Sequence, residues 1–231
     1  MAYALIVAAG KGTRLAGRLL KQYRPLAGVP VLTRTLHAME ACHGLFAGIV
    51  LVVSRADIDY CRDRIVAPAG LEIPVTLVAG GEQRQDSVYN GLCAIAATEG
   101  VVAIHDGVRP LVPPAVVRAC VETARRHGAA VAGVPVWDTV KRCGPDGVIA
   151  STLAREGIWL AQTPQAFRIG LIRRGHEQAR RDGYSGTDDA ALLERLGIPV
   201  YLVPGSRRNI KITTPEDLRL AEALAAHPAA D

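Results

Sequence analysis

Two glycines and several cations follow the first apolar run of the chain, and together they are suited to binding a polyphosphate. Residues 3–8 read as a buried strand, and Gly10 and Gly12 come directly after it. Glycine lets backbone N–H groups approach a phosphate closely, and Arg14 and Lys21 are placed to neutralise its charge. Two cations just beyond such a turn indicate chemistry on a nucleotide in addition to its binding.

This glycine loop matches neither of two common phosphate-binding motifs. In G-x-G-x-x-G a third glycine would stand where the chain has Leu15, and the pattern G-x-x-x-x-G-K-[ST] does not fit either. An ordinary strand-to-helix turn with incidental basic residues is the alternative interpretation. Against that alternative, Arg14, Arg18 and Lys21 all follow the end of one strand.

A second glycine-rich segment follows the strand expected at residues 74–79. Gly81 follows this strand, and Ser87 stands at the start of the next expected helix. They would bring backbone donors and a hydroxyl group near the same ligand, because ligands of parallel sheets lie at the carboxyl ends of the strands. The plain start of a helix, without a ligand, is the alternative interpretation of the same pattern.

A third group of polar residues follows the strand expected at residues 101–105. Asp106 and Arg109 stand three residues apart there, and such a pair suits a metal or a hydroxylated phosphate substrate. A purely structural ion pair is the alternative, and we interpret His105 as a packed strand residue. Lys211, near a late helix start, is a weaker candidate when taken alone.

The elements that must position these residues alternate between strands and helices. This alternation predicts an α/β fold with a Rossmann-like, mostly parallel sheet and helices on both faces. Asp57 stands at an expected helix start, so we interpret it as an N-cap and not as a metal ligand. The expected strands are 3–8, 48–53, 74–79, 101–105, 129–136 and 199–203, and the expected helices are 31–43, 57–66, 86–97, 114–127, 169–181, 187–196 and one that opens at Thr214.

The segment 137–159 interrupts this alternation. Val140–Cys143 and Val148–Ser151 flank Gly144-Pro145-Asp146-Gly147, which predicts a β-hairpin. A lone hairpin is marginally stable in water, so this arm must pack against its own domain or against a partner. We therefore expect one domain over residues 1–231 with 137–159 as a protruding arm.

Composition narrows the class of protein. The chain has 231 residues, 49% of them hydrophobic, and a net charge of +5, which favours anionic partners. The basic run Arg173–His176 with Arg180 and Arg181 is interpreted as the solvated face of a helix and not as an RNA-binding patch. Five widely spaced cysteines indicate free thiols, most of them buried. Without a leader or a membrane-spanning segment, we expect a cytoplasmic protein that binds neither nucleic acid nor a membrane.

The motifs that occur in order along the chain are Ala8-Ala9-Gly10-x-Gly12-x-Arg14, Lys21-Gln22-Tyr23, Gly80-Gly81-x-x-Arg84-x-x-Ser87-Val88, His105-Asp106-x-x-Arg109-Pro110, Asp138-Thr139-x-Lys141, Thr163-Pro164-Gln165 and Asn209-Ile210-Lys211. Together they resemble those of the 2-C-methyl-D-erythritol 4-phosphate cytidylyltransferase family, and the resemblance covers nearly the whole chain. One departure is Leu20, where the family usually has proline, and this change is expected to loosen the loop without removing its charge. We expect no fused cyclase domain of the kind that some relatives carry.

The resemblance implies a reaction between CTP and 2-C-methyl-D-erythritol 4-phosphate in non-mevalonate isoprenoid biosynthesis. It also implies Mg²⁺, held mainly by the CTP phosphates with no protein ligand assigned, and a homodimer formed through the arm. By resemblance, Arg14 and Lys21 stabilise the transition state, and Arg155 and Lys211 hold the attacking phosphate. The implied nucleotide-binding residues are Ala8, Ala9, Gly10, Gly12, Gly81, Arg84 and Ser87, and the implied substrate-binding residues are Asp106, Arg109, Thr139 and Thr163.

Three other functions remain open at this point. A ribitol 5-phosphate cytidylyltransferase would share most of these motifs, although Thr139 and Arg155 favour methylerythritol phosphate by resemblance. An NADP-dependent short-chain reductase would use Arg55 for the 2′-phosphate, but no tyrosine of this chain has lysine four residues on. A third alternative is a non-catalytic nucleotide-sensing or RNA-binding module. The presence of Arg14, Lys21, Arg155 and Lys211 together argues against it.

Overall fold

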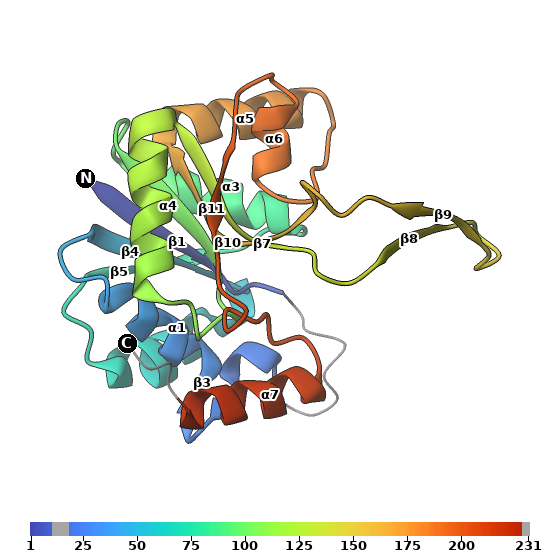
Figure 1. The fold of residues 1–231 in the computed structure, drawn as a ribbon. Coiled ribbons are helices and arrows are strands. Elements are labelled where there is room, and N and C mark those ends of the chain that lie inside the picture. Colours follow the sequence, from blue (N-terminus) through green and yellow to red (C-terminus); the bar gives the residue numbers. More distant parts are fainter. Residues whose placement is uncertain (11–18, 228–231) are drawn as a thin grey trace.

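A seven-stranded sheet forms the centre of the molecule (Figure 1). The computed structural model describes residues 1–10 and 19–227. The strands lie in the order β11-β7-β10-β6-β1-β4-β5, and every pairing except those of β10 is parallel. The predicted mostly parallel sheet is therefore confirmed. Its strands are β1 (Ala2–Val7), β4 (Phe46–Val53), β5 (Val75–Ala79), β6 (Val101–Asp106), β7 (Ala129–Pro135), β10 (Trp159–Arg168) and β11 (Tyr201–Pro204).

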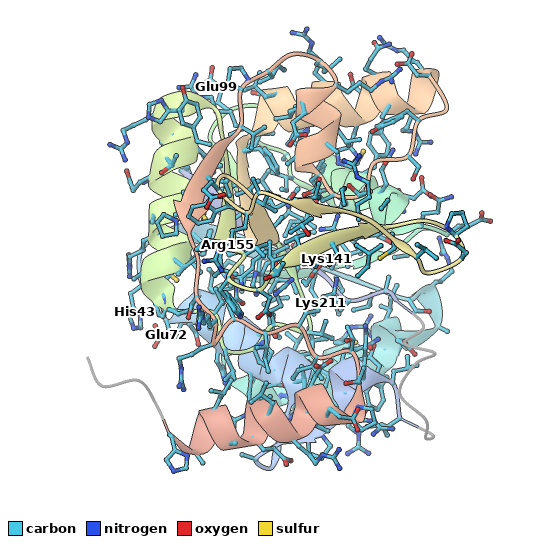
Figure 2. The ribbon with its side chains drawn as sticks, turned by 45° about the vertical axis from the view of Figure 1, so that its right-hand side comes forward. His43, Glu72, Glu99, Lys141, Arg155 and Lys211 are labelled. Carbon is cyan, nitrogen blue, oxygen red and sulfur yellow. The ribbon has the colours of Figure 1, made fainter. Side chains whose placement is uncertain are left out.

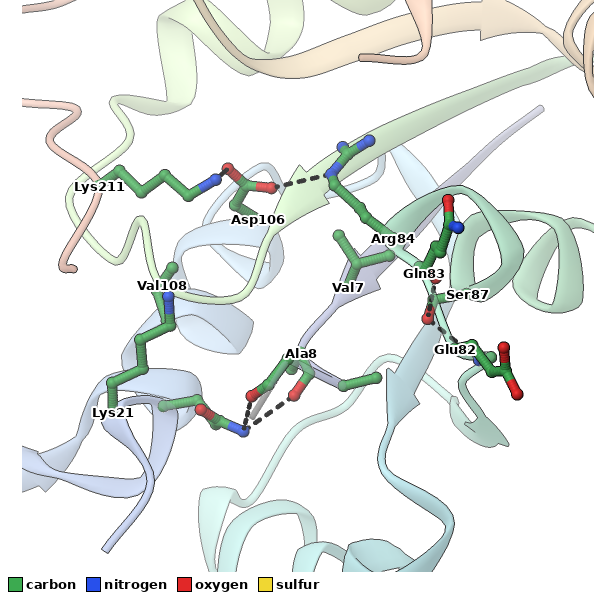
Figure 3. A pocket seen from close by; sticks show the side chains of 14 residues that line it. Val7, Ala8, Lys21, Glu82, Gln83, Arg84, Ser87, Asp106, Val108 and Lys211 are labelled. Atoms are coloured by element: carbon green, nitrogen blue, oxygen red, sulfur yellow. Dashed lines mark hydrogen bonds and ion pairs between the residues drawn. The ribbon is translucent and has the colours of Figure 1, made fainter. Parts of the chain in front are cut away.

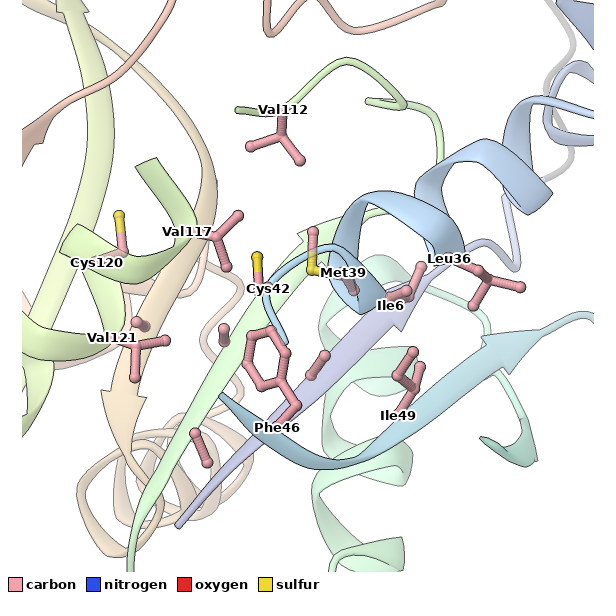
Figure 4. Close-up of a cluster of buried hydrophobic side chains, with 14 of the residues drawn as sticks. Ile6, Leu36, Met39, Cys42, Phe46, Ile49, Val112, Val117, Cys120 and Val121 are labelled. Carbon is pink, nitrogen blue, oxygen red and sulfur yellow. The ribbon is translucent and has the colours of Figure 1, made fainter. Parts of the chain in front are cut away.

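Helices cover both faces of the sheet. Side chains of a strand alternate between the two faces, so the apolar side chains of one strand contribute to two separate buried clusters. In β1, Ile6 belongs to the buried cluster under α1 and α4, whereas Leu5 belongs to the cluster under α3, α5 and α6. Figure 4 shows the first cluster, in which Leu36 and Met39 of α1 lie near Ile6. The helices are α1 (Val31–Glu40), α2 (Ile58–Cys61), α3 (Arg84–Ala94), α4 (Pro114–His127), α5 (Ile169–Arg181), α6 (Ala190–Glu194) and α7 (Pro215–Ala226).

Strand β10 is the main element that the sequence pattern did not predict. It runs antiparallel between β6 and β7, so it completes the sheet at its centre. Pro164 stands inside this strand, and proline removes a backbone donor, so its presence argues against a central strand. The pairing with β7 is irregular between Ala161 and Gln165, which is where the strand accommodates the proline.

The helix predicted at 57–66 is wrong in detail. A 3₁₀ turn η2 (Arg55–Asp57), the single α-helical turn α2, a π-helical segment η3 (Arg62–Val66) and a 3₁₀ turn η4 (Ala67–Ala69) replace it. Asp57 occupies the N-cap position of α2, as predicted, but its side chain accepts no capping hydrogen bond. Its carboxylate instead accepts a hydrogen bond of 3.2 Å from the Tyr23 hydroxyl.

The basic face of α5 is only partly solvated, which corrects a second expectation. Arg174, Arg180 and Arg181 are exposed, as predicted. Arg173 is half-buried and donates to the carbonyl oxygens of residues at the end of α3, and His176 is fully buried. Arg173 therefore closes the end of a neighbouring helix, where backbone carbonyls lack partners within the helix.

The arm predicted over residues 137–159 contains an isolated hairpin. Strands β8 (Val140–Cys143) and β9 (Ile149–Leu153) pair with each other in a separate two-stranded sheet that projects from the body (Figure 1). Val148 and Ile149 near its tip are 63% and 58% exposed. A second short sheet, β2 (Pro25–Leu26) with β3 (Val29–Pro30), precedes α1.

Two further expectations concern thiols and membranes. Cys42, Cys61 and Cys120 are buried, Cys93 and Cys143 are exposed, and all five are free thiols. Within the ranges 1–10 and 19–227, no helix has the length and apolarity needed to cross a membrane.

Candidate active site

A pocket opens at the carboxyl ends of β1 and β6 (Figure 3). The end of β1 supplies Val7, and the end of β6 supplies Asp106. Ligands of doubly wound sheets bind at this edge, so the position agrees with the one expected from the sequence. The lining residues are Val7, Ala8, Ala9, Gly10, Lys21, Gln22, Gly81, Glu82, Gln83, Arg84, Ser87, Asp106, Val108 and Lys211.

The glycines of this pocket serve two different purposes. A Cβ atom at Gly81 would lie 2.3 Å from the Asp86 Cβ, and one at Gly80 would lie 2.4 Å from the Ala9 Cβ. These two glycines are therefore required by close packing of the second glycine loop. A Cβ atom at Gly10 would meet no described atom within 4 Å, so this position leaves open space in which a ligand can approach the backbone.

Ser87 uses its hydroxyl group within the second glycine loop. The Ser87 Oγ donates to the Gln83 carbonyl oxygen at 3.1 Å and accepts from the Gly81 N–H at 3.1 Å. A hydroxyl has one hydrogen and two lone pairs. The buried Ser87 therefore retains one lone pair, and it can only accept a further hydrogen bond.

Three cations converge on Asp106 at the floor of the pocket. The Lys211 Nζ lies 2.9 Å from Asp106 Oδ2, and the Arg109 Nε lies 3.4 Å from the same oxygen. The Arg84 Nε lies 3.5 Å from Oδ1. Burial by itself would raise the pKa of Asp106, but Lys211, Arg84 and Arg109 outweigh it and hold that pKa well below its usual range. Asp106 is therefore a permanent anion that orients three cations.

A second pocket adjoins the first and shares this cluster. Asp106, Arg84 and Lys211 line both pockets, so they form the boundary between them. Two reactants bound on either side of this boundary would meet at the cations. The second pocket is lined by Arg84, Asp106, Arg109, Ala161, Gln162, Thr163, Gln165, Thr187, Asp188 and Lys211.

Thr163 connects β10 to β6 below the second pocket. Its Oγ accepts from the Asp106 N–H at 3.0 Å and lies 3.0 Å from the His105 Nδ1. The other ring nitrogen of His105 faces a carbonyl oxygen, which can only accept, so in the neutral ring Nδ1 accepts from the Thr163 hydroxyl. The His105 Nε2 then carries the ring proton and donates to the Arg109 carbonyl oxygen at 3.1 Å. His105 is fully buried, and burial lowers its pKa to about 4. The imidazole is thus a neutral packed group, as predicted, and not a base at the site.

This buried imidazole predicts a pH-dependent stability. The unfolded histidine binds a proton near its ordinary pKa of 6.5, whereas the folded one resists protonation until about pH 4. Stability should therefore fall by roughly 3 kcal/mol as the pH is lowered through this window. Urea unfolding at several pH values measures the slope. His105→Gln should lose this slope between the two pKa values, and an unchanged slope in that variant would assign it to other groups.

Lys211 is held by the segment before it. The Asn209 Nδ2 donates to the Thr163 carbonyl oxygen at 2.7 Å, and the Arg109 Nη1 donates to the Asn209 carbonyl oxygen at 2.7 Å. Beyond the lysine, the Ile212 N–H donates to the Val108 carbonyl oxygen at 2.9 Å. These bonds fix the backbone on both sides of Lys211, although its own side chain is partly exposed.

Lys21 lies in the 3₁₀ turn η1 (Lys21–Tyr23). The residue before it, Leu20, has φ −63° and ψ 148°, which is the conformation that a proline would impose. Leu20, which stands where the family usually has proline, therefore keeps the backbone conformation of a proline at this position. On the core side of the turn, the Tyr23 hydroxyl contacts Asp57 and lies 3.1 Å from the Cys61 Sγ. Burial raises the pKa of Tyr23, so the hydroxyl stays protonated.

Arg84 is anchored by a partner that the sequence pattern did not reveal. The Arg84 Nη1 lies 2.8 Å from Oδ2 of the buried Asp189. Burial would raise the pKa of Asp189, but Arg84 and His176 lower it. The Gln165 Oε1 accepts from the backbone N–H of Asp189 at 3.2 Å and so holds this residue in place. Arg84 thus bridges Asp106 and Asp189. The only sequence signal for this anchor was an acidic pair, Asp188-Asp189, at the start of the helix expected over 187–196.

Most of the predicted site residues are brought together, and some are not. Thr139 and Arg155 are exposed on the arm, outside both pockets as the described residues form them. Figure 2 shows Lys141 and Arg155 on this arm, and the Arg155 Nη1 donates to the Trp137 carbonyl oxygen. Gly12 and Arg14 lie outside the described residues. Ala8, Ala9, Gly10, Lys21, Gly81, Arg84, Ser87 and Asp106 line the first pocket, Asp106, Arg109 and Thr163 line the second, and Lys211 lines both.

The sequence of this chain is similar to those of known proteins. A family model described as 2-C-methyl-D-erythritol 4-phosphate cytidylyltransferase matches residues 2–227. A curated relative of that name from Pelotomaculum thermopropionicum is 50% identical over 221 residues, covering 96% of this chain and 92% of the relative.

Solved structures give the same result. The crystal structure of 4-diphosphocytidyl-2C-methyl-D-erythritol synthase from Anaerococcus prevotii superposes with a TM-score of 0.87 at 31% identity, covering 98% of this chain and 96% of that one. The 2-C-methyl-D-erythritol 4-phosphate cytidylyltransferase structure from Thermus thermophilus gives a TM-score of 0.77 at 34% identity, covering 96% of this chain and 98% of that one. The chain therefore belongs to the 2-C-methyl-D-erythritol 4-phosphate cytidylyltransferase family.

Proposed function

We propose that this protein is a nucleotidyltransferase that transfers CMP from CTP to 2-C-methyl-D-erythritol 4-phosphate. The products are 4-CDP-2-C-methyl-D-erythritol and pyrophosphate, in non-mevalonate isoprenoid precursor biosynthesis. The observation that carries the proposal is a family match over residues 2–227, joined to two pockets that share Asp106 and Lys211. A nicotinamide-dependent reductase is no longer a reasonable alternative for a member of this family.

The first pocket is the proposed CTP site. The open backbone at Gly10 leaves room for the nucleotide, and Ala8, Ala9 and Gly81 line the same pocket. The Ser87 hydroxyl supports a preference for CTP over UTP, because a lone pair can accept from the 4-amino group of cytosine but meets only an oxygen in uracil.

The second pocket is the proposed acceptor site, with Arg109 and Thr163 in its wall. An acceptor phosphate oxygen, oriented by Lys211, attacks the α-phosphorus of CTP. A new P–O bond forms, the bond to the β-phosphate breaks, and pyrophosphate leaves with the electron pair. The acceptor phosphate is already an anion, so the step needs no general base. Arg14 and Lys21 stabilise the negative charge that spreads over the transition state.

Mg²⁺ is the proposed metal, and the donor set of the pocket fits an ion carried by the nucleotide. The described residues contain no group of three or more histidine, cysteine or acidic side chains that would form a protein cage. The carboxylate of Asp106 is occupied by cations of the protein. Mg²⁺ commonly binds to phosphate oxygens with few protein ligands, and when bound it neutralises part of the triphosphate charge.

A homodimer is the proposed assembly, with residues 1–231 as one domain and the arm 137–159 reaching the neighbouring subunit. The isolated β8–β9 hairpin and the exposed side chains near its tip support this proposal, because such a hairpin gains stability from a partner surface. Thr139 and Arg155 would then complete the acceptor site of the other subunit. Five free cysteines agree with the reducing conditions of the cytoplasm, which is the proposed location.

A substrate screen tests the proposed function. CTP, UTP, ATP and GTP are each combined with 2-C-methyl-D-erythritol 4-phosphate or ribitol 5-phosphate, and pyrophosphate release is measured with and without Mg²⁺. We expect turnover with CTP and methylerythritol phosphate, and strong dependence on the metal. Turnover of ribitol 5-phosphate without turnover of methylerythritol phosphate would overturn the acceptor, and no nucleotide turnover at all would favour a non-catalytic module.

A further inference from the structure

Gln22 lies between the proposed nucleotide loop and the lysine proposed for catalysis. Its side chain is 1% exposed, and its Nε2 lies 3.0 Å from the Ala8 carbonyl oxygen and 3.4 Å from the Gly10 carbonyl oxygen. Both neighbours are acceptors, so the end of the amide that faces them must be the NH₂ group. The two amide hydrogens thus connect one side chain to two carbonyls of the first glycine loop.

The loop needs such a connection because the sheet stops supporting it. The pairing of β1 ends at Val7, beside Val52 and Asp106. The Ala8 N–H still donates to the Val52 carbonyl oxygen at 2.7 Å. Beyond that bond, among the described residues, the Gln22 amide is the group that fixes the Ala8 and Gly10 carbonyls.

The other end of this connection is the turn that carries Lys21. Gln22 follows Lys21 directly, so its side chain fixes the pocket side of the turn, while Tyr23 fixes the core side through Asp57 and Cys61. A displacement of the turn would therefore move the loop, and a displacement of the loop would move the lysine.

We propose that Gln22 is a positioning residue for cytidylyl transfer, which ties the backbone of Ala8 and Gly10 to the turn that carries Lys21. It touches neither reactant in this role; it acts by setting the distance between the bound triphosphate and the Lys21 ammonium. The inference rests on the proposed role of Lys21 and deepens it. Misplacement of a catalytic group by about 1 Å can lower a rate by roughly 10²-fold, so the effect is measurable.

Two substitutions separate hydrogen bonding from shape. Gln22→Met keeps a similar length but removes the donor, and kcat should fall by roughly ten- to a hundredfold. Gln22→Glu keeps the shape and presents a carboxylate to two carbonyl oxygens, which repel it. Burial and these oxygens should raise the pKa of the introduced carboxyl group, and its protonated form can again donate to the Ala8 carbonyl.

The decisive readout is the pH profile of kcat and of KM for CTP. Relative to wild type, Gln22→Glu should regain activity as the pH is lowered from about 8.5 to about 6, whereas Gln22→Met should stay low throughout. Among the residues that the structure describes, the other charged groups lining this pocket are Lys21, Glu82, Arg84, Asp106 and Lys211. Every charged group except residue 22 is the same in both variants, so the ratio of their profiles removes the titration of these groups. Parallel profiles of the two variants would overturn the proposal, and so would wild-type kcat and KM in Gln22→Met.

A double-mutant cycle shows whether Gln22 acts through Lys21. If it does, Lys21→Ala combined with Gln22→Met should lower kcat little beyond Lys21→Ala alone. Losses that multiply would overturn the coupling. If Lys21→Ala itself keeps normal turnover, the role proposed for Lys21 is wrong, while the acid recovery of Gln22→Glu can still appear in KM for CTP. Should Gln22→Met fail to fold, the profile of Gln22→Glu alone decides, since recovery at low pH supports the proposal and its absence contradicts it.

Discussion

Lys21→Ala should lower kcat by roughly 10²–10³-fold while changing KM for CTP much less. The ammonium group interacts most strongly with charge that develops as the α-phosphorus bonds rearrange, so its loss affects the transition state more than the bound triphosphate. Arg14→Ala is expected to behave in the same way. Steady-state kinetics at saturating CTP and acceptor measure the effect.

A surface cation provides the matched control for these two variants. Arg62 forms an exposed ion pair with Asp59 at 2.7 Å, away from the pocket, and Arg62→Ala should leave both constants near wild type. If Lys21→Ala keeps near-normal turnover at saturating CTP and only raises KM, Lys21 binds the ground state and does not stabilise the transition state.

Mixing two inactive variants should restore activity if the arm acts in the partner subunit. Arg155→Ala damages the arm and Lys21→Ala damages the pocket, so each homodimer should be nearly inactive. A heterodimer of the two has one site with an intact pocket and an intact arm. Random exchange of equal amounts makes half of the dimers mixed, so roughly a quarter of the wild-type activity should return.

The control for this experiment combines two lesions of one pocket. Lys21 and Lys211 line the same pocket of one chain, so a mixture of Lys21→Ala with Lys211→Ala should recover nothing beyond the separate variants. Subunit exchange is followed by mass spectrometry with one isotopically labelled variant. Demonstrated exchange without recovery in the Arg155→Ala mixture would mean that the arm serves its own chain.

The sequence predicted those parts of the site that depend on local pattern. The ends of β1 and β6 and the second glycine loop were all predicted from apolar runs followed by glycine, acid or base. Parallel strands bring their carboxyl ends to one edge, so the pattern of strands and helices by itself places Asp106 near the start of the glycine loop that follows β1. Ser87 was predicted for the same reason.

The remaining parts depend on contacts between distant segments. Nothing in the local pattern shows that Arg84 pairs with Asp189 or that the Gln22 amide bonds to Ala8. Strand β10 was missed because Pro164 conceals it, and it is held in place by its neighbours on both sides. Arg173 was predicted to be solvated because arginine is usually exposed. Its guanidinium instead donates hydrogen bonds to backbone carbonyl oxygens at the end of α3 that lack partners within the helix.

We propose that the cytidylyl group passes directly from CTP to the acceptor phosphate, with the protein supplying position and charge. Ser87 is not an activated nucleophile, since its hydroxyl is buried and its hydrogen is engaged by Gln83, and the Lys211 ammonium is ion-paired with Asp106. The stereochemical course at a chiral, sulfur-substituted α-phosphorus of CTP tests this directly, by ³¹P NMR of the product. A single displacement predicts inversion of configuration, whereas retention would require a covalent nucleotidyl-enzyme intermediate and would contradict the account.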